Sequence, residues 1–245
     1  DPPEPIRVRF PPTMAGAYDG EIATADLQVG RLLDHLADRG RLDRTLVVVL
    51  GDHGESLGEH GEEQHGFFVY DADIHIPLIV AGPGVPIRVV DDSVRIVDVM
   101  PTILELLRIA APKAVQGRSL LPLVRGERLD LVAMSETWYP RHHYGWSELT
   151  SIRDGRYHFI AAPRRELYDT QTDPGELHDI AAANASRADA LQGALRAFVA
   201  QTSASGPQTA PRPVDPDVEE RLRSLGYVGS SISPRTLEER PRGDP

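Results

Sequence analysis

At 245 residues the chain is long enough to bury a substantial core, in one large or two small domains, and its 40% hydrophobic and 26% charged residues are typical of an ordinary globular protein. The formal net charge of −11 argues against a nucleic-acid partner, because phosphate binding favours a basic surface, and no apolar run approaches the roughly 20 residues of a membrane span. The sequence has no cysteine, which excludes disulfides, thiolate metal sites and a thiol nucleophile within this chain.

The first half of the chain has the pattern of an α/β sheet. Apolar residues at helical spacing predict a helix from Tyr18 to Arg39, with one buried stripe and an end at Gly40. The run "TLVVVL" predicts a strand buried on both faces from Thr45 to Leu50, and "HIPLIVAGPG" predicts a second buried strand. "VRIVDVMPTILELLRIA" then predicts a short strand followed by a helix entered through Pro101.

After about Gly126 the pattern changes to short strands joined by turns. "LVAMSETW", "LTSIR", "RYHFI" and "RELYD" are strand-like, and Asp154-Gly155 is a strong hairpin signal between the second and third of them. A covering helix is predicted from Ala185 to Gln201, and a short one from Asp217 to Leu225. We therefore expect three parts: an α/β part over residues 1–126, a small antiparallel sheet with a helix over 127–203, and a linker, short helix and disordered tail over 204–245.

The loop "LGDHGESLGEHGEEQHG", residues 50–66, concentrates acidic and imidazole groups directly after the first predicted strand. Asp52 and His53 follow the last apolar residue, and Gly51 and Gly54 on either side allow a sharp turn that presents both side chains. A carboxylate and an imidazole suit a borderline divalent cation, whereas a calcium site relies more on oxygen. His65, twelve residues beyond His53, is placed to donate to an anionic oxygen or a leaving group. Four further carboxylates in the loop raise its affinity for cations: Glu55, Glu59, Glu62 and Glu63.

The same loop has a simpler interpretation. Asp-His pairs occur in ordinary surface loops, and a Glu-rich turn is often only a solvated one. Two adjacent ligands also cannot complete a coordination shell, so a metal bound here takes further ligands from elsewhere. The position behind a predicted strand, the paired glycines and the additional histidine favour metal binding over the simpler interpretation.

The stretch "TLVVVLGDHGESLGEHGEEQHGFFVYDADIHIPLIVAGPGVP" resembles the second metal-ligand segment of the sulfatases of the alkaline-phosphatase-like superfamily. Further landmarks of that family flank it on both sides, so the resemblance covers nearly the whole chain. It implies an α/β fold, part of an alkaline-phosphatase-like α/β/α sandwich, with a small C-terminal antiparallel sheet and a covering helix. The landmarks are "YDGEIATADLQVGRLLDHLADRGRLDRT", "VRIVDVMPTILELL", "VQGRSLLPLVRG", "ELYDTQTDPGELHDIA" and "LRSLGYVG".

The resemblance implies roles for three residues. Asp52 and His53 fall on the metal-ligand pair, and His65 falls where many sulfatases have a lysine that contacts the sulfate ester and polyspecific relatives have a histidine. His65 is therefore the expected catalytic and substrate-binding residue. The expected cofactor is one divalent metal ion: Ca²⁺ is usual in sulfatases, and Mn²⁺ or Zn²⁺ is the alternative because many sulfatases have Asp-Asn where this chain has Asp-His. Glu55 is expected to support the loop, and His60 to hydrogen-bond within it.

Parts of the family pattern are missing from this sequence. It lacks the Cys/Ser-x-Pro-x-Arg motif whose first residue becomes the formylglycine nucleophile, and it lacks the paired N-terminal aspartates that supply the other metal ligands. We therefore expect a sulfate ester hydrolase, acting on a small molecule or glycan, that requires the N-terminal half of the enzyme. The chain alone is expected to be inactive. A periplasmic or extracellular location is expected from the resemblance alone.

Two other functions remain open. A phosphodiesterase or phosphoethanolamine transferase of the same superfamily also uses Asp-His followed by a histidine twelve positions on. A non-catalytic module that keeps the scaffold is the other alternative, since no nucleophile motif is present. His75, at the entry to the second predicted strand, is expected to have a structural role or to lie at the rim of the site. The aromatic segment "TWYPRHHYGW" either lines a substrate pocket or packs between two sheets.

Overall fold

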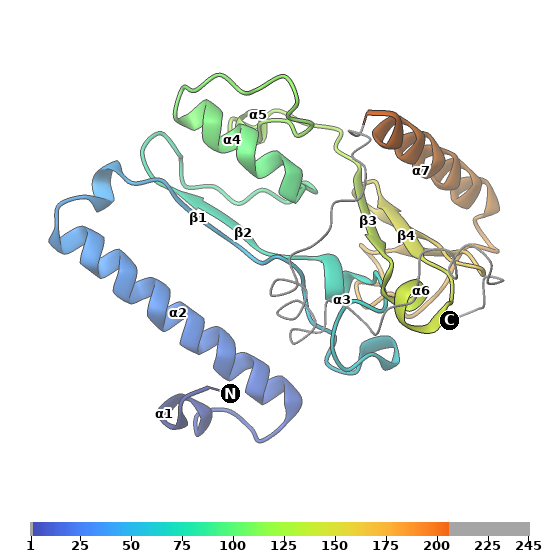
Figure 1. The fold of residues 1–245 in the computed structure, drawn as a ribbon, viewed down its shortest axis with the longest axis horizontal. Helices are drawn as coiled ribbons and strands as arrows, with labels where there is room; N and C mark the ends of the chain where they lie inside the picture. The colour runs from blue at the N-terminus through green and yellow to red at the C-terminus, as the bar shows by residue number, and fades with distance from the viewer. Residues whose placement is uncertain (1, 206–245) are drawn as a thin grey trace, which may run out of the picture. The chain divides into compact units, whose positions relative to one another are not determined.

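The structure is a computed structural model that describes residues 2–205, and the chain divides into two units (Figure 1). Among the described residues, the first unit comprises 2–64, 75–91 and 96–128, and the second comprises 65–74, 92–95 and 129–205. Residues 65–74 therefore belong to the second unit, although residues of the first unit flank them in sequence. The three-part division expected from the sequence stays a prediction.

The first unit contains helices and a two-stranded sheet. In chain order its elements are α1 (Glu4–Arg7), α2 (Met14–Asp38), the 3₁₀ turn η1 (Leu42–Arg44), β1 (Val47–Leu50), the 3₁₀ turn η2 (Glu59–Gly61), β2 (Leu78–Ala81), the 3₁₀ turn η3 (Ile96–Asp98), α4 (Val99–Leu106) and α5 (Leu121–Val124).

The long helix α2 confirms the helix predicted around residues 18–39. It starts earlier than predicted because Thr13 caps it, the hydroxyl oxygen accepting a hydrogen bond from the Gly16 N–H at 3.1 Å. It ends before Gly40, whose φ of +57° is the left-handed conformation that glycine adopts easily. The expected buried stripe is wrong for this chain, since Ile22 and Leu32 are 53% and 59% exposed.

Strands β1 and β2 pair antiparallel in the register Val47↔Ala81 to Leu50↔Leu78. Helix α4 packs on one face of this sheet, where Val48, Val80 and Ile103 line a common small apolar gap. Ile79 points to the opposite face and is 58% exposed. The prediction of strands buried on both faces is therefore wrong for this chain, because in the part that the structure describes α4 covers one face only.

The segment 94–110 forms the predicted helix but not the predicted short strand. Residues Ile96–Asp98 form a 3₁₀ turn, and α4 follows with Pro101 in its first turn. The turn is fixed by the fully buried Asp98, whose Oδ1 accepts a hydrogen bond from the Arg118 N–H at 2.8 Å. Thr102 also supports it, donating to the Asp98 carbonyl at 2.6 Å. These bonds hold the backbone in a turn where an isolated apolar run would be extended.

The second unit contains a four-stranded antiparallel meander in the order β3-β4-β5-β6, which confirms the predicted strands and hairpin. At the hairpin between β4 and β5, Gly155 has a φ of +77°. The described elements are α3 (Asp71–Ile74), β3 (Ala133–Thr137), α6 (Tyr139–Tyr144), β4 (Leu149–Arg153), β5 (Tyr157–Ala161), β6 (Glu166–Asp169) and α7 (Ala185–Ser205).

Each face of the meander has its own apolar core. Helix α7 covers one face, and residues 65–74 cover the other, because alternate residues of each strand point to opposite sides of the sheet. On the α7 side the buried residues are Ile152, Phe159, Leu167, Ala181, Ala188, Leu191 and Leu195. On the other side they are Val69, Leu149, Ile160 and Tyr168.

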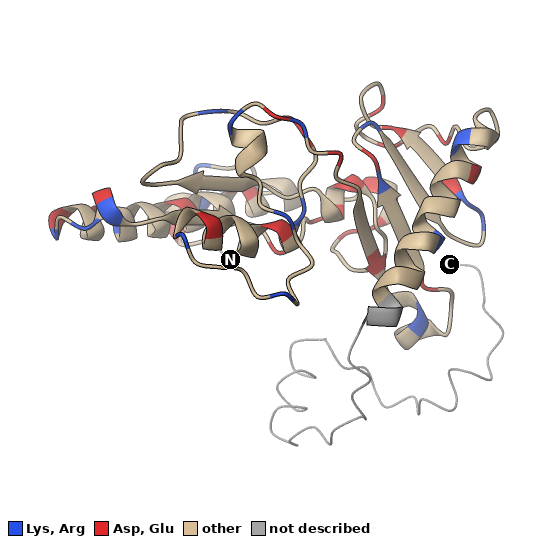
Figure 2. Cartoon of the chain, turned by 90° about the horizontal axis from the view of Figure 1, so that it is seen from above, with Lys and Arg blue, Asp and Glu red and all other residues tan. Residues whose placement is uncertain are grey.

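Helix α7 confirms the predicted covering helix, while the helix predicted at 217–225 lies outside the described residues. Lys and Arg are scattered among Asp and Glu along the described chain (Figure 2). Among the residues that the structure describes, no helix is both long and apolar enough to cross a bilayer.

Candidate metal and catalytic site

Asp52 and His53 lie two and three residues beyond Leu50, the last residue of β1, in the first unit. Gly51 relieves crowding in the turn: a Cβ at this position would lie 3.3 Å from the His53 carbonyl oxygen and 3.4 Å from the Ile76 side chain. The Asp52 carboxylate is exposed and also accepts a hydrogen bond from the His53 N–H at 3.1 Å. The strand and its glycine thus place both side chains at the sheet edge, as the sequence predicts.

The His53 ring is oriented by a contact with the backbone of the next residue. Its Nδ1 lies 2.8 Å from the Gly54 carbonyl oxygen, which can only accept a hydrogen bond, so Nδ1 has a proton, and in the neutral ring Nε2 then has the lone pair. Nε2 lies 3.8 Å from Asp52 Oδ2. That separation is below twice a typical metal–ligand distance of about 2.0–2.6 Å, so one cation can reach both atoms.

Glu55 is a third candidate ligand, which the sequence interpretation assigned to loop support. One of its carboxylate oxygens lies within 4.8 Å of a His53 ring nitrogen. Glu59 and Glu62 have structural roles instead: Glu59 Oε2 accepts from the Leu57 N–H at 2.5 Å, and Glu62 is only 8% exposed. The loop is closed by backbone hydrogen bonds, and His60 at its tip is in the left-handed conformation with a φ of +52°.

His65 is the first residue of the second unit and is exposed. Gly66 follows it with a φ of +96°, a conformation that glycine adopts without strain. The carbonyl oxygen of Gly66 accepts a hydrogen bond from the Thr137 hydroxyl at the end of β3. The imidazole that is expected to contact substrate is thus attached to a turn whose backbone is bonded to the sheet.

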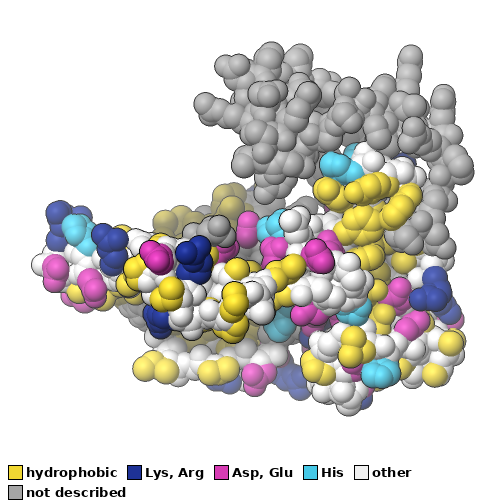
Figure 3. Space-filling model, turned by 90° about the horizontal axis from the view of Figure 1, so that it is seen from below, with side chains coloured by type: hydrophobic (Ala, Val, Ile, Leu, Met, Phe, Trp, Pro, Cys, Tyr) yellow, Lys and Arg dark blue, Asp and Glu magenta, His cyan; other side chains and the backbone are white. Residues whose placement is uncertain are grey.

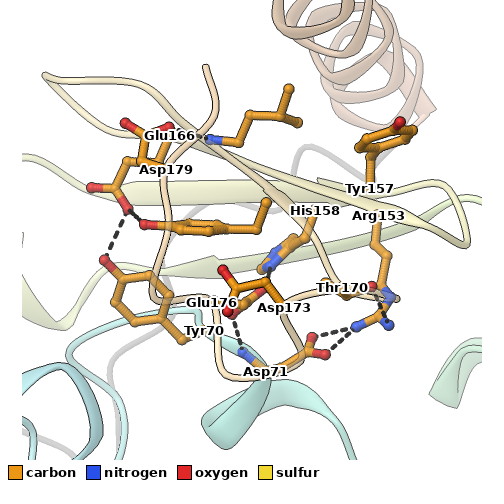
Figure 4. Close-up of polar contacts among 12 residues, drawn as sticks. Tyr70, Asp71, Arg153, Tyr157, His158, Glu166, Thr170, Asp173, Glu176 and Asp179 are labelled. Atoms are coloured by element: carbon orange, nitrogen blue, oxygen red, sulfur yellow. Dashed lines mark hydrogen bonds and ion pairs between the residues drawn. The ribbon is translucent and has the colours of Figure 1, made fainter. Parts of the chain in front are cut away.

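A second group of acidic and imidazole side chains lies inside the second unit, where Asp71, His158 and Glu176 offer ligand atoms within 4.8 Å of one another. Figure 4 shows why this group is an ion-pair network and a poor metal site. The Arg153 guanidinium donates to both carboxylate oxygens of Asp71. One oxygen of Glu176, Oε2, accepts a hydrogen bond from the Asp71 N–H, and the other, Oε1, lies 2.6 Å from His158 Nδ1. A cation would have to displace the Arg153 guanidinium, which already neutralises the Asp71 carboxylate.

The aromatic segment around α6 packs partly against Phe67, two residues after His65. Phe67 lies 5.7 Å from Tyr144 and 5.5 Å from Trp146, measured between ring centroids. Trp138 and Tyr144 are nevertheless 44% and 53% exposed. Figure 3 shows hydrophobic side chains gathered in several patches on the face that it draws. Whether the segment contacts substrate stays a prediction.

The buried network around Glu176 was missed by sequence reasoning, which treated "TDPGELHDIA" only as a landmark. The sequence gives little indication of this network, because a charged residue after Asp-Pro-Gly is typical of an exposed turn. In the structure, however, Glu176 is only 2% exposed and has a φ of +53°. His158 is also fully buried, and its position in the apolar strand β5 was the available hint. Pairing such residues over a sequence separation of 18 needs the fold.

Comparison with known proteins places this geometry in a recognised class. A family model described as Sulfatase matches residues 1–109, and one described as N-sulphoglucosamine sulphohydrolase, C-terminal, matches residues 58–204. Arylsulfatase K of Xenopus laevis is 30% identical over 197 residues, which cover 74% of this chain and 36% of that protein. Choline-sulfatase of Rhizobium meliloti is 32% identical over 171 residues, covering 67% of this chain and 32% of that protein.

Solved structures agree with the family models. The phosphonate monoester hydrolase of Silicibacter pomeroyi aligns with a TM-score of 0.63 and 31% identity, covering 80% of this chain and 42% of that chain. The fold is therefore part of an α/β protein of the alkaline-phosphatase-like class, as predicted. Within that class, the chain belongs to the sulfatase family. It spans about a third of the length of the curated relatives that it matches.

Proposed function

We propose that this chain is part of a metal-dependent sulfate ester hydrolase, in which Asp52 and His53 bind one divalent cation and His65 contacts the sulfate ester. The main support is the His53 geometry: Nδ1 is bonded to the Gly54 carbonyl, and Nε2 lies 3.8 Å from the Asp52 carboxylate. An Asp-His pair in an ordinary surface loop has no need of a fixed tautomer. Membership of the sulfatase family supports the same assignment.

The metal that we propose is Ca²⁺, as is usual in the family, with Mn²⁺ and Zn²⁺ as alternatives. The donor set fits a divalent cation, since it combines carboxylate oxygen from Asp52, and from Glu55 if it joins, with imidazole nitrogen from His53. The nitrogen donor favours Mn²⁺ or Zn²⁺ more than Ca²⁺. Bound here, the cation would supply positive charge that stabilises anionic oxygens during sulfuryl transfer.

The residues of this chain have distinct tasks in that reaction. Asp52 and His53 hold the cation at the end of β1, and the Gly54 carbonyl fixes the His53 ring. His65 donates a hydrogen bond to the ester, or a proton to the departing oxygen, and so lowers the charge that develops on the leaving group. The nucleophile, a formylglycine by family resemblance, comes from outside this sequence.

We further propose that the active enzyme requires an N-terminal half that completes the α/β layer. Apolar side chains on both main elements of the first unit support this: Ile79 on the sheet is 58% exposed, and Leu32 on α2 is 59% exposed. A sheet face and a helix stripe of this kind are normally covered. A periplasmic or extracellular location is proposed from family resemblance alone.

The test is sulfate release by the full-length enzyme that contains this sequence. Aryl, choline and hexosamine sulfates serve as substrates, with Asp52→Asn and His53→Gln as variants. We expect turnover of at least one ester and a loss of about 10²-fold or more in each variant. The 245-residue chain alone should show no turnover above an Asp52→Ala control. A full-length enzyme that hydrolyses none of these esters, or variants that match the wild type, would contradict the proposal.

Hydrolysis of a phosphonate or phosphate ester is the second candidate, favoured by the 31% identity to a phosphonate monoester hydrolase. The same full-length enzyme assayed on phenyl phosphonates and phosphodiesters decides between the two. If kcat/KM for a phosphorus ester exceeds that for the best sulfate ester by tenfold or more, phosphorus ester hydrolysis becomes the preferred function. A module without catalysis would show no turnover of either class while still binding metal.

A further inference from the structure

The His65 segment, residues 65–74, is fixed to the sheet of the second unit along its whole length. Its central residue Val69 is 2% exposed and packs with Leu149, Ile160 and Tyr168 on the face opposite α7. Burial of this apolar side chain favours contact with the sheet, but apolar contact is non-directional and does not set the angle of the segment. The angle depends on directional bonds at the two ends.

At the N-terminal end the bond comes from Thr137, the last residue of β3. Its hydroxyl donates to the carbonyl oxygen of Gly66, the residue after His65, and its oxygen accepts from the Tyr139 N–H at 3.2 Å. A β-branched threonine has restricted χ1 rotamers, so the hydroxyl is held in place by the strand. The peptide that follows His65 is therefore tied to β3 through one hydroxyl group.

At the C-terminal end the bonds come from Arg153 and Glu176, as Figure 4 shows. The Arg153 guanidinium donates to both carboxylate oxygens of Asp71, and Glu176 Oε2 accepts from the Asp71 N–H at 2.8 Å. Glu176 is itself held by His158, whose Nδ1 lies 2.6 Å from Oε1, with both side chains at most 1% exposed. Glu176 adopts a φ of +53°, a left-handed conformation that costs free energy and persists only where its surroundings impose it.

A third attachment lies between these ends. The Tyr70 hydroxyl donates to Glu166 Oε2 at 2.9 Å, and the Tyr168 hydroxyl donates to the same oxygen at 2.6 Å. Burial, together with the negative charge of Glu166, raises the pKa of both tyrosines well above the ordinary value. Both phenols therefore stay protonated as donors over the physiological range. Attachments at Gly66, Tyr70 and Asp71 leave the segment little freedom to rotate.

We propose that Thr137 and Glu176 are positioning residues for His65: the small sheet orients the catalytic imidazole by fixing the backbone on its C-terminal side. This inference rests on the proposed function, because it assigns a purpose to the orientation of His65. It gives Thr137 and Glu176 a part in catalysis that does not depend on their own contact with substrate. Thr137 is the more direct of the two, since its hydroxyl contacts the residue next to His65.

The test compares Thr137→Val, which removes the hydroxyl at nearly constant volume, with Thr137→Ser, which keeps it. In the full-length enzyme we expect Val to lower kcat about 10–100-fold with KM within about twofold, because small misplacements of a catalytic group cost rate. Serine should restore kcat to within about threefold of wild type. The loss should be larger for esters with a poor leaving group than for nitrophenyl sulfate, which needs little proton donation.

A second measurement on the same variants does not need activity. Backbone hydrogen exchange of peptides spanning 65–74 should accelerate at least tenfold in Thr137→Val and remain unchanged in Thr137→Ser. Thr150→Val in the neighbouring strand β4 is the matched control, because the Thr150 hydroxyl makes no hydrogen bond within the described part of the chain. If Thr137→Val does not fold, Glu176→Gln against Glu176→Ala provides the same exchange comparison at residues 70–74.

The outcomes are separable. An inactive wild-type enzyme refutes the proposed function, and the exchange data then decide the positioning inference alone. Unchanged exchange and an unchanged kcat in Thr137→Val overturn the positioning inference while leaving the function intact. Equal losses in Thr137→Val and Thr137→Ser, or a loss that does not depend on the leaving group, also overturn it, because they indicate a general structural defect.

Discussion

Replacing Glu176 by alanine removes the central acceptor of the buried network in the second unit. Both Glu176 oxygens are used, one by the Asp71 N–H and one by His158 Nδ1. Without them His158 stays fully buried, and its Nε2 already has no hydrogen-bond partner in the described part of the chain. Alanine keeps the Cβ, so the cost of the positive φ at position 176 is the same in both proteins.

The expected loss follows from those contacts. Breaking a buried pair by removing one partner costs about 3–5 kcal/mol, since the remaining group is left buried and unpaired. For a unit of roughly 100 residues, in which 1 kcal/mol corresponds to about 4–8 °C, that is a fall in Tm of roughly 12–40 °C. Glu176→Gln keeps an acceptor for the Asp71 N–H, so it should lose less, about 1–3 kcal/mol.

The assay is urea unfolding followed by tryptophan fluorescence. Both tryptophans of the chain, Trp138 and Trp146, belong to the second unit, so the signal reports on that unit. Glu136→Ala is the matched control: Glu136 is exposed on β3 and should change stability by less than about 0.5 kcal/mol. If Glu176→Ala falls within 1 kcal/mol of wild type at an unchanged m-value, the network does not stabilise the unit and our account of it is wrong.

Two further predictions concern pH and backbone space. The pKa values of Tyr70 and Tyr168 are raised in the folded state. Their contribution to the free energy of unfolding is therefore fully present below the unfolded pKa of about 10, and it is lost as pH rises from there through the folded pKa. Alkaline titration at 295 nm should therefore show two tyrosines that ionise only on unfolding, and normal titration of all seven tyrosines would contradict this. Gly117→Ala should destabilise the first unit by several kcal/mol, because its Cβ would lie 1.9 Å from the Val97 carbonyl oxygen. Gly193→Ala, with nothing within 4 Å of its Cβ, should instead stabilise α7 by about 0.5–1 kcal/mol. Equal Tm values for the two variants would refute the packing argument.

Local patterns predicted the elements well where short-range physics decides them. The Asp154-Gly155 turn, the strands beside it and the helix from Ala185 depend on hydrogen bonds and apolar spacing within a few residues. Asp52 and His53 could be placed in the loop after β1, because an apolar run predicts the strand and a polar pair flanked by glycines predicts the turn that follows it.

Burial and long-range pairing were harder to predict. An apolar stripe on α2 and a β-branched strand indicate that a face prefers to be covered, but not whether this chain supplies the cover, and Ile22 and Ile79 remain exposed. Residues 96–98 are apolar enough for a strand, yet the buried Asp98 holds them in a turn through Arg118. The partner of His158 is a glutamate in a distant turn, and no periodicity links the two.

Metal content of the purified full-length enzyme tests the central claim most directly. After dialysis against a metal-free buffer, we expect about one divalent ion per wild-type chain by mass spectrometry of the metal. We expect less than a tenth of that in Asp52→Asn and His53→Gln. The chain offers a matched control in the exposed Asp-His pair on α2, and Asp34→Asn and His35→Gln should keep the full complement. Full metal content in the Asp52 and His53 variants, or equal losses in both pairs, would contradict the account.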